Sequence, residues 1–220
     1  TNGSLSNFAA TSSTVYTATF TPTADGAVTI DVGAAGFTDS YGNNNTAATQ
    51  FNWTYDTSRP TITITATDGS NAVSDSSTTN DGTLTVTFTS SEATTNFAVG
   101  DITETNGSLS SFTQTSSTVY TVTFTPTADG AATINVAGST FTDAAGNNNT
   151  AATQFNWTYD TSAPTMTITA AEGADGFTSN DSTLALTFTS SEATTNFAVG
   201  DITETNGSLS SFTQTSSTVY

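Results

Sequence analysis

The chain has 220 residues, with 19 acidic side chains against a single basic one, Arg59, so its formal net charge is −18. Binding to nucleic acid or to an anionic membrane surface requires basic side chains, which excludes both as partners. The sequence has no His, Cys or Lys, and this excludes Ser-His-Asp triads, cysteine nucleophiles, Schiff bases and zinc sites built from His or Cys. We therefore predict that the protein is not an enzyme. Oxygen is its only plentiful ligand atom, and hard cations such as Ca²⁺ prefer oxygen.

The chain is an internal repeat. Thr1–Tyr55 aligns without gaps on Thr105–Tyr159, and Thr87–Tyr120 is identical to Thr187–Tyr220. The motif Tyr-Asp-Thr-Ser-x-Pro stands at both boundaries between units, and a proline that cannot donate to a central ladder suits a linker. We expect the chain to be a window of a longer array. The predicted segments are the C-terminal part of a repeat at 1–55, a complete repeat at 56–159 and the N-terminal part of a third repeat at 160–220.

Hydrophobic residues in the complete repeat recur with a period of two, which predicts half-buried antiparallel strands. The predicted strands are Thr61–Ala66, Thr83–Thr89, Tyr120–Thr125, Ala132–Val136 and Phe155–Tyr159. Further predicted core residues are Phe97, Val99, Ile102, Leu109, Phe112 and Phe141. A low share of Leu, Ile, Val and Phe usually indicates disorder, but here β-branched Thr fills the outward strand positions. The sequence therefore predicts an all-β protein built from tandem immunoglobulin-like β-sandwiches.

Several ordered motifs resemble a known family. They are Phe97–Thr103, Thr105–Leu109, Val119–Pro126, Phe141–Asn147, Asp160–Pro164 and Leu184–Glu192. Together they resemble the bacterial Ig-like (Big) repeats of giant extracellular surface adhesins and matrix-like proteins. The resemblance implies an elongated, exported array attached to the cell surface, which holds a terminal binding domain away from the cell. It also implies calcium between neighbouring domains as a stiffening ion.

Acidic and amide side chains in the turns and linkers are candidate calcium ligands, because Ca²⁺ takes six to eight oxygens and these can converge from a turn, a linker and the next domain. In the turn Asp-x-x-Gly-Asn and the linker that follows it, the candidates are Asp143, Asn147 and Asp160, with Asp39, Asn43 and Asp56 as their counterparts. Glu172 or Asp175 would reach the second junction from the following domain. The competing interpretation is that Asp-x-x-Gly-Asn is only a good turn and that the linker Asp only caps it.

Two other patterns have plain explanations. Glu92 and Asp101 could form a catalytic pair of carboxylates, but they recur as Glu192 and Asp201, which favours solvated loop acids over catalysis. Rows of alternating Thr could match the lattice of ice, but the sheets of a sandwich twist, so a soluble β-forming surface is favoured.

Asn-x-Ser/Thr triplets are frequent and could carry glycans in an exported protein.

We predict a structural extender, or stalk, whose partners are the neighbouring repeats of the same array. The alternative is a subunit of a self-assembling extracellular filament or sheath, in which like chains contact one another through open sandwich edges. No apolar run approaches the length of a membrane span, so we expect no membrane insertion in this segment.

Overall fold

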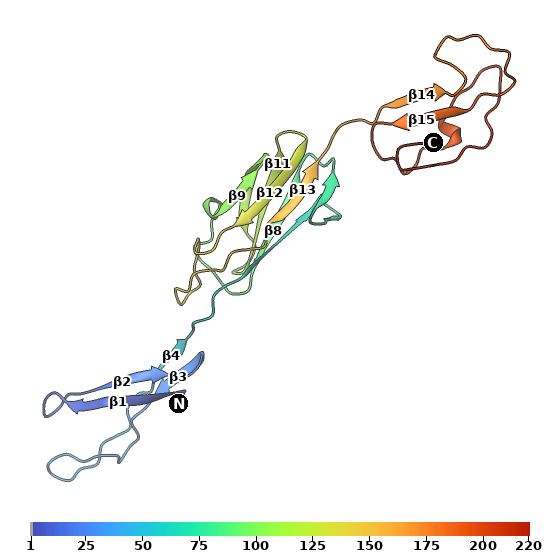
Figure 1. Cartoon of the computed structure of the whole chain (residues 1–220). Helices are drawn as coiled ribbons and strands as arrows, with labels where there is room; N and C mark the ends of the chain where they lie inside the picture. The colour runs from blue at the N-terminus through green and yellow to red at the C-terminus, as the bar shows by residue number, and fades with distance from the viewer. Residues whose placement is uncertain (1) are drawn as a thin grey trace. The chain divides into compact units, whose positions relative to one another are not determined.

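The computed structural model describes residues 2–220 and divides after Asp160 into two compact units (Figure 1). The regular elements of the described residues are β-strands and two short 3-10 helices. The predicted all-β class is confirmed.

The complete repeat is a sandwich of two sheets within the first unit. One sheet has the strand order β10-β11-β8-β5-β6 and the other the order β7-β13-β12-β9. The elements are β5 (Ile62–Thr67), β6 (Ala72–Val73), β7 (Ser77–Thr79), β8 (Leu84–Ser90), η1 (Val99–Asp101), β9 (Ile102–Thr105), β10 (Gly107–Gln114), β11 (Val119–Pro126), β12 (Gly130–Val136) and β13 (Phe155–Tyr159). All strand pairs are antiparallel except β13 with β7.

The period of two in the sequence becomes the two faces of each strand. In β8 the apolar residues Leu84, Val86 and Phe88 are fully buried, whereas the Thr residues between them are more exposed. The five strands predicted in the complete repeat correspond to β5, β8, β11, β12 and β13. The strands β6, β7, β9 and β10 were not predicted from the alternation, because they are short or carry few large apolar residues.

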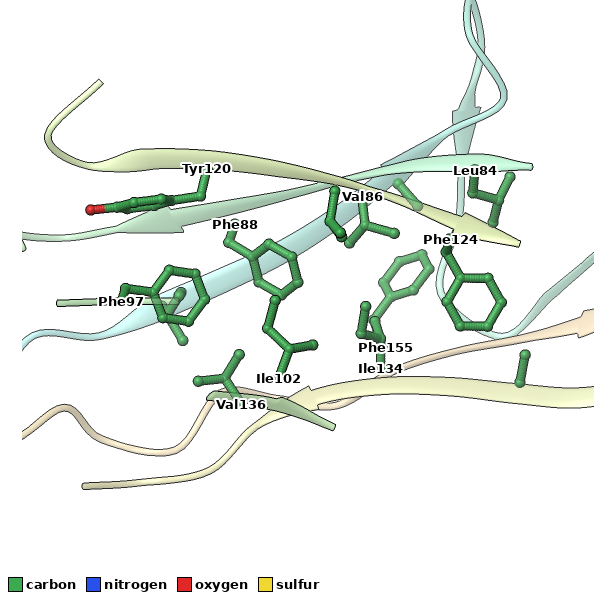
Figure 2. Packing of buried hydrophobic residues seen from close by; sticks show 14 of the residues in the cluster. Leu84, Val86, Phe88, Phe97, Ile102, Tyr120, Phe124, Ile134, Val136 and Phe155 are labelled. Carbon is green, nitrogen blue, oxygen red and sulfur yellow. The ribbon is translucent and has the colours of Figure 1, made fainter. Parts of the chain in front are cut away.

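Aromatic side chains dominate the core between the two sheets (Figure 2). Phe97 packs edge-on against Tyr120 and Phe141, with ring centroids 5.0 and 5.1 Å apart. Phe124 packs edge-on against Trp157 at 4.6 Å. The predicted core residues lie in or against this cluster, with one exception. Val99 is exposed, because it belongs to the short helix η1 rather than to a strand.

Residues 2–55 form two small sheets, each of two antiparallel strands. β1 (Gly3–Ala10) pairs with β2 (Tyr16–Pro22), and β3 (Gly26–Ile30) pairs with β4 (Phe51–Tyr55). These strands occupy the repeat positions of β10, β11, β12 and β13. Their apolar residues are less covered: Phe51 is 65% exposed, whereas its counterpart Phe155 is 6% exposed.

The second unit contains the strands of the first half of a repeat. β14 (Met166–Ala170) pairs antiparallel with β15 (Leu186–Ser190), followed by the short helix η2 (Val199–Asp201). The register, with Ile168 opposite Phe188, reproduces that of β5 with β8, where Ile64 lies opposite Phe88.

The chain enters the complete repeat at one end of the sandwich and leaves it at the other (Figure 1). At the entry end, the Thr150 amide donates to the Pro60 carbonyl at 2.9 Å. At the exit end, the Asp160 amide donates to the Thr79 carbonyl at 3.0 Å. The loops at the entry end therefore lie beside the linker that leads into the complete repeat. The candidate site lies at this end.

Candidate metal centre at the first linker

The turn that begins at Asp143 is fixed by its own hydrogen bonds. The Asn147 backbone amide donates to Asp143 Oδ1 at 2.8 Å, and the Asn147 side-chain amide donates to Asp143 Oδ2 at 2.9 Å. Gly146 within the turn has a positive φ of 92°, which glycine adopts without steric cost. A bridge between Asp143 and Thr94 ties the turn to the loop that follows β8. Asp143 is thereby held in a buried position.

The linker beside this turn is held from both sides. Asn147 donates from its side chain to the Asp56 carbonyl at 3.1 Å. The guanidinium of Arg59 donates to the carbonyls of Asn148 and Asn149 at 2.8 and 2.9 Å. The only basic side chain of the chain thus contacts backbone carbonyls in these hydrogen bonds rather than neutralising an acidic group.

On the other side of the linker, the carboxylate of Asp25 accepts three hydrogen bonds. The Thr57 amide and hydroxyl donate to it at 3.0 and 2.9 Å, and the Ser58 hydroxyl donates to it at 3.1 Å. Asp25 lies in the turn between β2 and β3 of the first segment. The linker is therefore bonded both to residues 2–55 and to the complete repeat.

Three carboxyl groups converge at this place. Asp56 from the linker, Glu92 from the loop after β8 and Asp143 from the turn each offer an oxygen, and these oxygens lie within 4.8 Å of one another. Oxygens bound to one Ca²⁺ at 2.3–2.6 Å can be up to about 5 Å apart when they lie on opposite sides of the ion. The spacing and the all-oxygen donor set therefore fit a hard divalent cation.

The electrostatics of the group agree with this fit. Desolvation raises the pKa of Glu92, and the negative charges of Asp56, Asp143 and Asp25 raise it further. Burial also raises the pKa of Asp143, but the hydrogen bonds from the side chain and backbone of Asn147, with those from Gly146 and Ala145, outweigh it and leave that pKa below its ordinary value. A bound cation would relieve the repulsion that acts on Glu92.

The comparison with protein families decides what kind of chain carries this site. The family model described as bacterial Ig-like domain matches residues 1–55, 56–159 and 160–220, which together span the chain. The chain belongs to the bacterial Ig-like domain family. No curated protein and no solved structure matches it. The described residues contain no helix that is long and apolar enough to cross a membrane.

In this bacterial Ig-like domain, the turn at Asp143 contacts a different linker from the one that the sequence pattern predicts. The sequence pattern groups Asp143 and Asn147 with Asp160, the linker residue that follows the domain. The structure brings them instead to Asp56, the linker residue in front of it. The reason is the direction of β13, which carries the chain from the end that holds the turn to the opposite end, where Asp160 lies beside Thr79.

In residues 2–55, Asp39 and Asn43 form the same turn as Asp143 and Asn147, but no group of carboxyl groups surrounds it. Asp39 Oδ1 accepts from the Asn43 and Tyr41 amides, both at 2.9 Å, and Asp39 Oδ2 accepts from the Asn43 side chain at 2.9 Å. These hydrogen bonds hold the pKa of Asp39 below its ordinary value. Among the described residues, no further acid joins Asp39 in a group of three.

In the second unit, Glu172 and Asp175 lie in the loop that follows β14, while the linker precedes that strand. Glu172 accepts from the Ala185 amide at 3.0 and 3.1 Å, and Asp175 is exposed at a turn. The strand of five residues between linker and loop spans about 17 Å, so the two acids do not meet the linker end of β14.

Two residues at the candidate site and its linker, Glu92 and Asp25, are not singled out by the sequence pattern. Glu92 was interpreted as a solvated loop acid, and Asp25 was not singled out. The available signal for Glu92 was its position directly after the Thr-Ser-Ser motif in both copies, but its neighbours Asp56 and Asp143 are distant in sequence. For Asp25 the signal was the recurrence of the Thr-Ala-Asp-Gly turn with the Asp-Thr-Ser linker.

Proposed function

We propose that this chain is part of the non-catalytic stalk of an exported bacterial surface adhesin, and that Ca²⁺ bound by Asp56, Glu92 and Asp143 stiffens the junction at the first linker. The convergence of these carboxyl groups at the linker, from three separate segments of the chain, carries the proposal. Membership of the bacterial Ig-like domain family supports the surface location. A stalk needs length and resistance to bending rather than a catalytic group, and tandem repeats provide both through contacts between neighbours.

Calcium would act on the junction by joining the linker to the sandwich. Asp56 belongs to the linker, whereas Glu92 and Asp143 belong to loops of the complete repeat. An ion bound by all three resists the separation of the linker from the domain. The remaining coordination positions of Ca²⁺ would be filled by second carboxylate oxygens, backbone carbonyls or water.

The test compares thermal unfolding of the chain in EDTA and in Ca²⁺, with calorimetric titration of Ca²⁺ as the direct measure of binding. At a Ca²⁺ concentration about 100-fold above Kd, binding to the folded state stabilises it by about 2.7 kcal/mol. For a repeat of this size the Tm should rise by at least about 10 °C. An unchanged Tm together with no heat of binding would contradict the calcium site.

Glu92→Gln is the informative variant, and Glu192→Gln is its matched control in the second unit. Because the folded-state pKa of Glu92 is raised, its contribution to stability is complete below the unfolded pKa and is lost as the pH rises through the folded pKa. At pH 7 in EDTA, the Glu92→Gln variant should therefore have a higher Tm than the unmodified chain. The rise in Tm that Ca²⁺ causes should be mostly absent in this variant. Glu192→Gln should leave both values unchanged, because Glu192 joins no such group among the described residues.

A further inference from the structure

Arg59, the only basic residue of the sequence, joins the first linker to a distant part of the complete repeat. Its guanidinium donates from Nε to the Asn148 carbonyl at 2.8 Å and from Nη2 to the Asn149 carbonyl at 2.9 Å. The two acceptors lie 89 and 90 residues after Arg59 in the chain. Hydrogen bonds from an ionised donor are stronger than neutral ones, and the rigid guanidinium fork also fixes their direction.

The next linker residue is bound to the same segment. Pro60 is buried, and its carbonyl accepts a hydrogen bond from the Thr150 amide at 2.9 Å. Arg59 and Pro60 together therefore contact three consecutive residues, 148–150. We call this contact the Arg59 clamp. Its hydrogen bonds hold the linker at one fixed position along the segment.

The segment that receives the guanidinium is held from inside the domain. Asn149 is fully buried, and its side-chain oxygen accepts from the amides of Thr140 and Phe141 at 2.8 and 3.1 Å. Its side-chain nitrogen donates to the Ala137 carbonyl at 2.8 Å. A buried amide side chain whose oxygen and nitrogen are both bonded fixes the backbone around it. The carbonyls that Arg59 contacts thus belong to a fixed part of the sandwich.

The same segment leads directly into the last strand of the repeat. Residues 151–154 connect Thr150 to β13, and β13 carries the chain to the exit end, where Asp160 begins the next linker (Figure 1). The first linker is therefore bonded to a segment whose covalent continuation is the second linker. The other route from linker to linker runs through β5, which begins at Ile62, and then through the strand pairs of the sheets.

Tension between the two linkers divides between these routes. The route through β5 pulls on its pairing with β8, and so on the sandwich itself. The route through the Arg59 clamp passes into the backbone of residues 148–160 and follows β13 without pulling it away from its neighbours. While the clamp holds, β5 carries only part of the tension.

We propose that the Arg59 clamp transfers tension from the first linker to the segment before β13 and so keeps β5 from being pulled out of its sheet. The following linker has Ala163 at the position of Arg59, so the motif Tyr-Asp-Thr-Ser-x-Pro does not itself supply the guanidinium. The clamp has a role only where the chain carries tension, so it rests on the proposed stalk function, but it needs no bound cation. Because unfolding under force is governed by the unfolding rate, the effect belongs to kinetic stability.

The test applies force on either side of the clamp in single molecules. One chain carries Ser58→Cys and the other Thr61→Cys, and both carry Ala163→Cys as the second attachment point. The three positions are exposed, and the unmodified chain has no cysteine. Force applied at position 58 reaches the sandwich through Arg59 and Pro60, whereas force applied at position 61 bypasses both. Unfolding rates are measured at constant force in EDTA, so that calcium takes no part.

We expect the repeat to unfold at least about tenfold more slowly when the force is applied at position 58 than at position 61, because charge-assisted hydrogen bonds must break first. The two attachment points differ by three residues of linker and otherwise load the same domain. Equal unfolding rates from both points would overturn the proposal.

Arg59→Ala separates the clamp from ordinary stability. With force at position 58, the variant should unfold about tenfold faster than the unmodified linker, since both guanidinium bonds are lost. With force at position 61, its rate should change by no more than about twofold, as for most surface substitutions. Arg59→Lys keeps the charge but lacks the planar fork, so most of the loss should remain. An equal acceleration from both points would mean that Arg59 only stabilises the fold, and the clamp would be wrong.

Asp101→Ala is the matched control, because it removes a charge-assisted hydrogen bond away from both linkers. The Asp101 carboxylate accepts from the Ala98 amide at 2.8 Å, in the connection between β8 and β9. Its effect on the unfolding rate should be the same from both attachment points, and an effect confined to position 58 would contradict the proposed route of tension. The calcium site is tested separately, since calorimetric titration with Ca²⁺ does not depend on the clamp and the force measurements contain no Ca²⁺.

Discussion

At the scale of single residues, packing against Phe124 requires glycine at position 107, in the Thr-Asn-Gly-Ser-Leu motif of the complete repeat. A Cβ placed on Gly107 would lie 2.1 Å from Cζ of Phe124, whose fully buried ring packs on Trp157. Gly107→Ala should therefore overpack the core and lower the stability of the complete repeat by about 2 kcal/mol, which corresponds to a fall in Tm of about 10 °C in calorimetry. The control is Gly207→Ala, where a Cβ meets nothing within 4 Å. An equal fall in both variants would show that backbone effects, not the Phe124 ring, set the requirement for glycine.

At the scale of elements, the strands could be predicted from the sequence and the site only in part. Alternation along β8 or β11 is a local property, and burial of one face of the sheet fixes it. Which loops lie close together depends instead on the direction of each strand, because the direction decides at which end of the sandwich the next loop lies. Residue type makes Asp56 and Asp143 candidate ligands, but Glu92, which converges with them, comes from a third segment. The turn lies beside the linker in front of the domain, whereas Asp160 follows the domain and lies beside Thr79. A short helix at Val99 likewise interrupts an apolar pattern that is otherwise typical of strands.

The linker offers a prediction at this same scale. The Thr57 amide donates to Asp25, whereas the adjacent Ser58 amide donates to Asp56 Oδ1, each at 3.0 Å. Asp25→Ala removes the first acceptor and keeps the second. Hydrogen exchange measured by NMR should therefore become faster at Thr57 while it stays nearly unchanged at Ser58. If both amides accelerate equally, the linker is held as a whole by Asp25 rather than by two separate bonds.

At the scale of the whole molecule, the distribution of buried apolar residues predicts an uneven map of hydrogen exchange. Nearly all of the buried core belongs to residues 62–157, and isolated two-stranded sheets are only marginally stable in water. In dilute solution, amides of β8, β11 and β12 should be protected strongly, and those of β1, β2, β14 and β15 weakly. Strong protection of β2 and β15 would contradict this map, because it would mean that each two-stranded sheet is stable without further strands.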